Sequence, residues 1–270
     1  MAKRVESPSS INTLKQCPRK YYYRYIMGLP SLPSIATVRG KIVHSVLENI
    51  FDIDITGITK DNCKEIIRSK AQSLLVHFWN KQRQEFITLG VEEHQEHMVF
   101  QETLLMVLNW SDSFAQKMIS HPGDFTEAFK EHTPLREQLL HSQELSVRGF
   151  ADAIETIKGK IRIMDYKTSK KDDISEEYRL QLGIYALLYK EKHGTPPDVV
   201  GIYFLKDTSH VEKSVTVDQD IMDLARLEIE LIHMHTQSDA IQDYPKKITP
   251  LCKWATGKCD YYEKCFGKTN

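Results

Sequence analysis

Two short motifs in the middle of the sequence place carboxylates and a lysine where they can act together. Gly149-Phe-Ala-Asp152 lies in an alternating run, and a β-branched run ends at Asp165, two residues before Lys167. The residues around Gly159, between the two runs, predict a hairpin turn that brings both acids to one place. Lys167 then points to the same strand face as Asp165. Two carboxylates this close need a cation between them, and oxygen ligands favour Mg²⁺ or Mn²⁺.

The lysine of this hairpin has two interpretations. Beside a metal ion, Lys167 can orient an attacking water or stabilise charge on a phosphate. An Asp-x-Lys sequence on a strand is also common as a solvated surface pair. The apolar strand before Asp165 favours the functional interpretation, because an uncompensated carboxylate there is costly to desolvate.

The composition is that of a folded protein with a large core. The chain has 270 residues, 41% of them hydrophobic, and a formal net charge of −1. We expect a single domain. No apolar run is long enough to cross a bilayer and the N-terminus lacks the apolar core of a signal peptide, so we expect a cytoplasmic location and no membrane partner. Any contact with nucleic acid must come from local charge clusters.

The cysteines are few for a disulfide scaffold. They are Cys17, Cys63, Cys252, Cys259 and Cys265, and three of them fall in the last twenty residues. In a reducing compartment such a cluster favours a metal over disulfides.

Helical and strand-like patterns follow one another along the chain. Helices are predicted from Ser7, over 39–51, 61–84, 92–119, 177–189 and 221–235, and strands over 199–205 and 213–218, with strand-like pieces over 125–147. This order predicts an α/β fold with a central mixed sheet flanked by helices. The two long helices before residue 120 are expected to form a helical layer or lid, and His233 and His235 are expected at the surface.

Tyrosines alternate with basic residues near the N-terminus. The segment Cys17-Pro-Arg-Lys-Tyr-Tyr-Tyr-Arg-Tyr25 carries cations at Arg19, Lys20 and Arg24. Aromatic rings stack on bases and cations bind phosphates, so this segment is a candidate DNA contact. At helical spacing the tyrosines could instead pack inward while the cations stay in water, and both interpretations can hold together.

A histidine lies at the edge of an apolar helix face. His44 falls beside the stripe of the helix predicted over 39–51, with Glu48 one turn later on the same side. A histidine in this position is commonly a hydrogen-bond partner in a core. It could instead be a metal ligand that faces the two carboxylates.

Several pieces of the sequence, taken together, resemble the RecB-type nucleases of the PD-(D/E)XK superfamily, and within them the iron–sulfur branch of AddB and the CRISPR-associated RecB-like exonucleases. In chain order the pieces are Cys17-Pro-Arg-Lys-Tyr-Tyr-Tyr-Arg-Tyr25, Gly40-x-x-x-His44-x-x-Leu47-Glu48, Gly149-x-x-Asp152, Asp165-Tyr166-Lys167, Gln181-x-x-x-Tyr185 and the C-terminal cysteines. Each piece is weak alone, but their order is specific. The resemblance implies a restriction-endonuclease-like core.

The resemblance also implies roles for individual residues. His44, Asp152 and Asp165 are expected to be ligands of Mg²⁺ or Mn²⁺, with the backbone carbonyl of Tyr166 as a further ligand, and Lys167 is expected to position the nucleophilic water. Gln181 and Tyr185 are expected to support the active site and contact the DNA strand, although Tyr185 also continues an apolar stripe. Glu131 could be an additional acid on the preceding strand.

The same resemblance implies a [4Fe-4S] cluster that ties the two ends of the chain together. Its ligands are expected to be Cys17, Cys252, Cys259 and Cys265. Six residues separate Cys252 from Cys259, a longer gap than is common in the family, so zinc or no metal are the alternatives. Cys63 has no counterpart in the family and is expected to pack on its helix.

The sequence thus predicts a metal-dependent DNA exonuclease acting on a single strand or a frayed end. Its segments are expected to be a mainly helical part (1–125), a nuclease core (126–235) and a cysteine-containing segment (236–270). A role in DNA repair, recombination, replication or CRISPR adaptation follows from the resemblance, with protein partners from a recombination or CRISPR complex. The alternatives are a non-catalytic DNA-binding or assembly subunit and a hydrolase of RNA.

Overall fold

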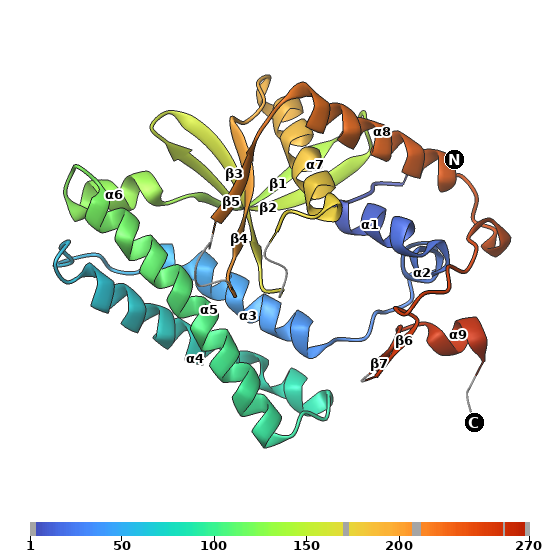
Figure 1. The fold of residues 1–270 in the computed structure, drawn as a ribbon, viewed down its shortest axis with the longest axis horizontal. Helices are drawn as coiled ribbons and strands as arrows, with labels where there is room; N and C mark the ends of the chain where they lie inside the picture. Colours follow the sequence, from blue (N-terminus) through green and yellow to red (C-terminus); the bar gives the residue numbers. More distant parts are fainter. Residues whose placement is uncertain (1–3, 170–172, 207–211, 256, 268–270) are drawn as a thin grey trace.

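A five-stranded mixed sheet forms the centre of the protein (Figure 1). The computed structural model describes residues 4–169, 173–206, 212–255 and 257–267. The strands are β1 (Leu135–Ser142), β2 (Val147–Ile157), β3 (Lys160–Lys167), β4 (Val199–Phe204) and β5 (Glu212–Thr216), in that spatial order. Only the β3–β4 pair is parallel. The predicted α/β fold with a central mixed sheet is confirmed.

Helices cover both faces of this sheet (Figure 1). They are α1 (Pro8–Gln16), α2 (Pro18–Tyr21), α3 (Ile35–Asn49), α4 (Cys63–Thr88), α5 (Glu93–Ser120), α6 (Phe125–His132), α7 (Glu176–His193), α8 (Gln219–His235) and α9 (Tyr262–Phe266), with the short π-helix η1 (Tyr22–Ile26) and the 3₁₀ helices η2 (Ile50–Asp52) and η3 (Ile241–Asp243). Ser7 caps α1 and Gly194 ends α7 in the left-handed conformation, as their residue types favour. The predicted helices are present, and α3 begins a few residues earlier than expected because Ser34 caps it.

Two apolar cores lie on opposite faces of the sheet. One packs α3, α4, α5 and α6 against Ala153, Met164 and Tyr203. The other packs α1, α7 and α8 against Ile154 and Ile163. Neighbouring residues of β2 and β3 therefore point into different cores, as the alternation of a strand buried on both faces requires.

The predicted hairpin between the two acidic motifs is present. Ile157 pairs with Lys160, and the two residues between them, Lys158 and Gly159, have φ values of +50° and +77°. Positive φ at both central positions is the type I′ geometry that matches the twist of the strands. The register of this tight turn fixes which residues of β2 and β3 meet at the far end of the hairpin.

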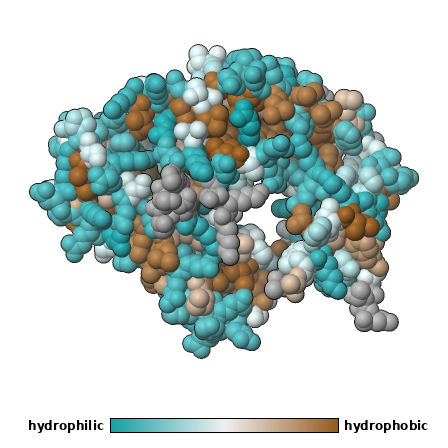
Figure 2. All heavy atoms as spheres, viewed as in Figure 1, coloured by the Kyte–Doolittle hydropathy of each residue, from teal (hydrophilic) through white to brown (hydrophobic). Residues whose placement is uncertain are grey.

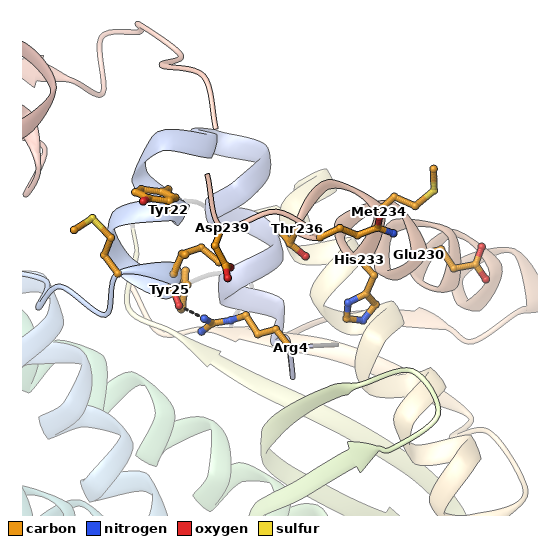
Figure 3. Close-up of a pocket in the computed structure, with 11 residues that line it drawn as sticks. Arg4, Tyr22, Tyr25, Glu230, His233, Met234, Thr236 and Asp239 are labelled. Carbon is orange, nitrogen blue, oxygen red and sulfur yellow. Dashed lines mark hydrogen bonds between the residues drawn. The ribbon is translucent and has the colours of Figure 1, made fainter. Parts of the chain in front are cut away.

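Two sequence predictions outside the hairpin are wrong. Residues 125–132 form the helix α6 rather than a strand-like piece, because Asp124 and Glu127 make a capping box. His233 is not a surface residue, because its ring nitrogen lies 2.7 Å from the carbonyl oxygen of Leu145 and its side chain is buried. Figure 3 shows this ring among the side chains that line a cavity between α8 and η1, where Arg4 donates a hydrogen bond to the carbonyl of Tyr25. The volume of this cavity is about 1130 Å³.

The surface is mainly hydrophilic in the view of Figure 2, with hydrophobic patches that include one over α8. That helix has a buried face and, besides it, apolar side chains that reach solvent: Leu224, Leu227, Leu231 and Met234. Within the described ranges, none of the helices combines the length and the apolarity that a membrane span needs.

A half-buried charge network ties α5 to the sheet. Arg162 on β3 contacts the carboxylates of Glu155 and Glu212, and Lys117 of α5 lies 3.3 Å from Glu212. The hydroxyl of Tyr203 donates to Glu155 and accepts from Lys117, both at 2.8 Å. Burial acts to raise the pKa of Glu212, but Lys117 and Arg162 outweigh it and lower that pKa below its usual value.

Replacing Glu212 with glutamine is expected to lower the free energy of unfolding at pH 7 by about 1–2 kcal/mol, because both cations lose a partner. A lowered folded pKa means that the ionised carboxylate stabilises the fold above the unfolded pKa, and that this stabilisation is lost as pH falls through the folded pKa. The difference between wild type and Glu212→Gln in urea unfolding should therefore shrink from pH 7 toward pH 3. Exposed Glu230 of α8 gives the control variant, Glu230→Gln, and equal losses in both variants would contradict the prediction.

Candidate active site

Three elements bring the four predicted catalytic side chains to one end of the sheet. Asp152 comes from β2, Asp165 and Lys167 from the end of β3, and His44 from α3. The register pairs Ala153 with Met164, so Asp152 and Asp165 come next to each other where the paired stretch ends. Both carboxylates are buried, with 9% and 3% of their residue surface exposed. The sequence-based expectation that these acids meet across a hairpin is therefore met by the geometry.

His44 connects α3 to both strands of the hairpin. Its Nδ1 lies 3.4 Å from Oδ1 of Asp152, and its Nε2 lies 3.1 Å from the carbonyl oxygen of Tyr166. The other carboxylate oxygen of Asp152 accepts a hydrogen bond of 2.7 Å from the backbone N–H of Tyr166. His44 is thus neither a surface residue nor a simple core residue, because both of its nitrogens face groups that the sequence assigned to a metal site.

Gln181 of α7 holds the other half of the site. Its Nε2 donates to Oδ1 of Asp165 at 2.7 Å and to the hydroxyl of Tyr185 at 2.9 Å, and its Oε1 accepts from Nζ of Lys167 at 3.1 Å. Nζ of Lys167 also lies 2.5 Å from Oδ2 of Asp165. A single glutamine side chain therefore fixes the positions of the acid and the lysine at the same time, in a way that a shorter or charged residue could not.

Glu137 of β1 was not predicted, yet it reaches the same site. The register of β1 and β2 places it opposite Asp152, and its φ is +48°. At this point β2 changes phase, since Ala151 and Ile154 belong to the same core although they are three residues apart. Both strands depart from regular geometry where the site begins. The signal in the sequence is an acid on the strand that pairs with the Gly-x-x-Asp motif.

Glu131, the acid that the sequence analysis placed on the preceding strand, is elsewhere. It lies on α6, where its carboxylate contacts Nε2 of His121 at 2.8 Å and accepts from the backbone N–H of Lys158 at 3.2 Å. The expectation that Glu131 is an additional acid of the site is wrong. It failed because the segment before β1 folds as a helix.

Burial and neighbouring charges shift the pKa values of the ionisable groups at the site. Burial acts to lower the pKa of His44, but the hydrogen bond and the charge of Asp152 outweigh it and raise that pKa to about 9. Burial raises the pKa of Asp165 to about 6, against the opposing charge of Lys167 and with a further rise from Asp152. Partial desolvation and Asp152 also raise the pKa of Glu137. The carboxylates thus repel one another unless a cation lies among them.

Lys167 stays charged in this setting. Burial acts to lower the pKa of its ammonium group, but the charge and hydrogen bond of Asp165 raise it above the usual value. A protonated lysine cannot accept a proton at neutral pH. Its chemistry at this site is therefore to donate hydrogen bonds and to stabilise negative charge.

The donor set fits a hard divalent cation. Within the part of the chain that the structure describes, one group of side chains offers three atoms close enough to hold a metal ion, namely His44, Glu137 and Asp152, whose ligand atoms lie within 4.8 Å of one another. Oδ2 of Asp165 is buried and, among the described residues, accepts no hydrogen bond beyond its ion contact with Lys167. Oxygen-rich sites of this kind suit Mg²⁺ or Mn²⁺.

A Glu137→Gln variant is expected to bind Mn²⁺ or Mg²⁺ about tenfold more weakly, because it replaces a charged oxygen ligand with a neutral one. Isothermal titration of the purified protein with MnCl₂ measures this. Glu131→Gln is the matched control, since the described partners of that carboxylate are His121 and the backbone of Lys158 rather than residues of the site. Unchanged affinity in Glu137→Gln, or an equal loss in both variants, would exclude Glu137 as a ligand.

The basic residues that were predicted to contact DNA lie beside the C-terminal segment. Arg19 donates to the carbonyls of Tyr244 at 2.7 Å and Ile241 at 3.2 Å. Lys20 lines the cavity of the cysteines, and the guanidinium of Arg24 lies 5.2 Å from the ring centre of Tyr25. Arg19 therefore has a structural partner already. A DNA contact of these three residues stays a prediction.

The tyrosines between these cations pack largely inward. Tyr21 and Tyr23 are buried, and the hydroxyl of Tyr21 donates to the buried carboxylate of Glu6 at 2.5 Å. The tyrosine hydroxyl of Tyr23 donates to the carbonyl of Lys264 in the C-terminal segment at 3.2 Å. The segment thus contacts both chain ends. Of the tyrosines expected from helical spacing to pack inward, Tyr21 is buried, whereas Tyr22 and Tyr25 are half-buried.

The four predicted cluster cysteines line one small cavity. Cys17, Cys252, Cys259 and Cys265 meet there, next to Lys20 and Phe266. The long gap between Cys252 and Cys259 is taken up by a hairpin of β6 (Lys253–Trp254) and β7 (Gly257–Lys258), and the backbone N–H of Cys259 donates to the carbonyl of Cys252 at 2.9 Å. The hairpin therefore returns the chain so that these two cysteines are neighbours. Cys63 is buried in α4, away from them.

Comparison with known proteins agrees with the geometry. A family described as the PD-(D/E)XK nuclease superfamily matches residues 6–266. The Gene 69 protein of Mycobacterium phage L5 is 25% identical over 257 residues, which cover 82% of this chain and 83% of that protein. The Gene 69 protein of Mycobacterium phage D29 is 25% identical over 225 residues, 74% of each chain.

A solved structure shares the fold. A protein from Eubacterium rectale, described as a candidate exonuclease, superimposes with a TM-score of 0.52 at 12% sequence identity, over 93% of this chain and 86% of that chain. At this level of identity the likeness concerns the fold alone, which extends over the helical layers as well as the sheet.

Proposed function

The chain belongs to the PD-(D/E)XK nuclease superfamily, and we propose from this that it is a Mg²⁺- or Mn²⁺-dependent deoxyribonuclease acting as an exonuclease on a single strand or a frayed end. The predicted resemblance to RecB-type nucleases of this superfamily is confirmed, whereas membership of the iron–sulfur branch stays a prediction. The observation that carries the proposal is the convergence of His44, Asp152, Asp165 and Lys167 at one end of the β2–β3 hairpin.

The side chains of His44, Glu137 and Asp152 would hold the metal, because their ligand atoms lie within 4.8 Å of one another. Further ligands would be the backbone carbonyl of Tyr166, which His44 contacts, and the carboxylate of Asp165 on β3. A bound ion would lower the pKa of a water molecule and neutralise charge on the scissile phosphate. A ligand histidine must give up a proton, so the raised pKa of His44 sets a competition between protons and metal at this residue.

Lys167 would position the attacking water. Its ammonium group is held from two sides, by Oδ2 of Asp165 and Oε1 of Gln181. A donor that is already fixed loses little entropy when it binds the water or a phosphate oxygen. Gln181 would act as a positioning residue, since it touches Asp165 and Lys167 together and is itself bonded to Tyr185.

Digestion of end-labelled DNA tests this function. Single-stranded DNA, duplex DNA and RNA of the same sequence are incubated with the protein in Mg²⁺ and in EDTA. We expect single-stranded DNA to be shortened from an end in Mg²⁺ only, with duplex DNA degraded more slowly and RNA left intact. Metal-dependent degradation of RNA alone would overturn the choice of substrate. Binding of DNA without cleavage would point instead to a DNA-binding or assembly subunit.

We also propose that Cys17, Cys252, Cys259 and Cys265 hold a [4Fe-4S] cluster. Their convergence on one cavity supports a metal group. Four thiolates suit a [4Fe-4S] cluster, and a tetrahedral Zn²⁺ is the alternative for the same ligand set.

The spectrum of anaerobically purified protein, with its iron and zinc content, tests the cluster. We expect a brown protein with broad visible absorption. Its iron content should be on the order of four irons per chain. A colourless protein that contains about one zinc per chain would overturn the iron assignment and keep the cysteine site. The cellular process and any protein partners stay predictions from the resemblance.

A further inference from the structure

A groove leads away from the catalytic residues along β2. The whole groove has a volume of about 600 Å³. Lys167, Gln181 and Tyr185 line one part of it, and residues of α1 and β2 line the rest. This size is in the range of pockets that hold small organic ligands. The groove shares its residues with the site described above, so anything bound in it would lie next to the reacting phosphate.

One wall of the groove is a stripe of uncharged polar side chains on α1. Ser9, Asn12, Thr13 and Gln16 follow one another at helical spacing, and all four line the groove. These side chains carry hydroxyl and amide groups that donate and accept hydrogen bonds without a net charge. Such a wall can contact sugars and phosphates of any sequence. Among the described residues of the lining, Glu177 is the one that is acidic.

An exposed aromatic residue and a cation of β2 also line the groove. Phe150 of β2 has 53% of its surface exposed, which is unusual for a phenylalanine on a strand inside a sheet. Arg148, two residues earlier, is also exposed and points to the same face of the strand. Within the described part of the chain, the guanidinium of Arg148 makes no ion pair. A flat apolar ring beside a free cation is the combination that binds an unpaired base and its phosphate.

The floor of the groove depends on a glycine. A Cβ at Gly149 would lie 2.7 Å from the ring of Tyr185, closer than real Cβ contacts allow. A larger residue here would displace Tyr185, whose hydroxyl is bonded to Gln181. The glycine of the Gly-x-x-Asp motif therefore lets β2 approach α7, and this approach lets the groove run on from Phe150 to Lys167.

We propose that this groove binds one unpaired DNA strand, with a base stacked on the ring of Phe150 and a phosphate near Arg148. The inference rests on the proposed nuclease function and adds the residues that select a single strand. Inside a duplex both faces of each base are already stacked on neighbouring bases. A base must therefore be unpaired before it can stack on the ring of Phe150. Selection of single strands thus comes from stacking beside the catalytic centre rather than from the catalytic residues themselves.

Anisotropy of a labelled oligothymidylate measures this binding. EDTA is present so that no strand is cut. Phe150→Ala is expected to bind about tenfold more weakly, because one base–aromatic stack is lost. Phe150→Trp keeps a ring and should bind as the wild type does. Ile87→Ala, which removes an exposed apolar side chain of α4, is the matched control and should leave the affinity unchanged.

A strand of the same length with abasic sites separates stacking from folding. Wild type should bind the abasic strand as weakly as Phe150→Ala binds oligothymidylate, and Phe150→Ala should bind both strands alike. Arg148→Ala should instead weaken both strands and lower the slope of log affinity against log salt by about 0.7. Unchanged oligothymidylate binding by Phe150→Ala, or an equal loss on the abasic strand, would overturn the proposal.

Cleavage assays keep this proposal distinct from the function on which it rests. If the wild type degrades DNA in Mg²⁺ while Phe150→Ala binds and cuts single strands normally, the groove assignment fails and the nuclease stands. If Phe150→Ala loses affinity but the wild type cuts no substrate, the groove stands and the nuclease proposal fails.

Discussion

Lys167→Met is expected to slow DNA cleavage by about two to three orders of magnitude while the protein stays folded. The variant keeps the length of the side chain and removes the charge that Asp165 and Gln181 hold in place. Loss of one preorganised charge-stabilising donor costs about a hundredfold to a thousandfold in rate. Single-turnover cleavage of end-labelled single-stranded DNA in excess Mg²⁺ measures the effect.

Folding is checked by circular dichroism and by the thermal midpoint, because removing Lys167 also leaves Asp165 with one fewer partner. Lys206 provides the matched control, since its ammonium group pairs with Glu102 at 2.9 Å rather than with a residue of the site. Lys206→Met should cut DNA at the wild-type rate. A folded Lys167→Met protein that is fully active would refute the assigned role of Lys167.

Cys17→Ser is expected to remove the metal group and to destabilise the protein. Cys17 lies between α1 and α2, whereas the other three cysteines are near the C-terminus, so the group would cross-link the two ends of the chain. Loss of a cross-link of this span costs about 2–5 kcal/mol, or roughly 5–15 °C in the thermal midpoint. Metal content, visible absorption and thermal unfolding under anaerobic conditions measure the loss.

Cys63→Ala serves as the comparison for this variant. Cys63 is a buried cysteine outside the cavity, so its replacement should retain the colour and the metal content. A Cys17→Ser protein that keeps both its metal and its thermal midpoint would show that the four cysteines do not act as one site.

The core of the site could be predicted from sequence because its motifs are local. Asp152, Asp165 and Lys167 lie on two strands joined by a tight turn, and the turn fixes their register. Gln181 and Tyr185 are one helical turn apart, so their shared face was also visible. The family resemblance then connected His44, which lies more than a hundred residues before the hairpin.

Glu137 could not be predicted because its place depends on tertiary structure. Its neighbour Asp152 is fifteen positions away in the sequence, and the contact requires that β1 pair with β2 in one register and depart from regular geometry there. The helix α6 displaced Glu131 for a local reason that was available in the sequence, namely the capping box of Asp124 and Glu127. The buried ring of His233 depended on the distant turn at Leu145.

The proposed catalytic group is assembled from both helical layers. His44 belongs to the layer packed on one face of the sheet and Gln181 to the layer packed on the other, and each bonds to the hairpin that lies between them. Neither layer alone contains a complete site. If these residues act together as proposed, catalysis requires the docked three-layer assembly. A partial opening that frees either layer would then inactivate the protein while most of its secondary structure persists.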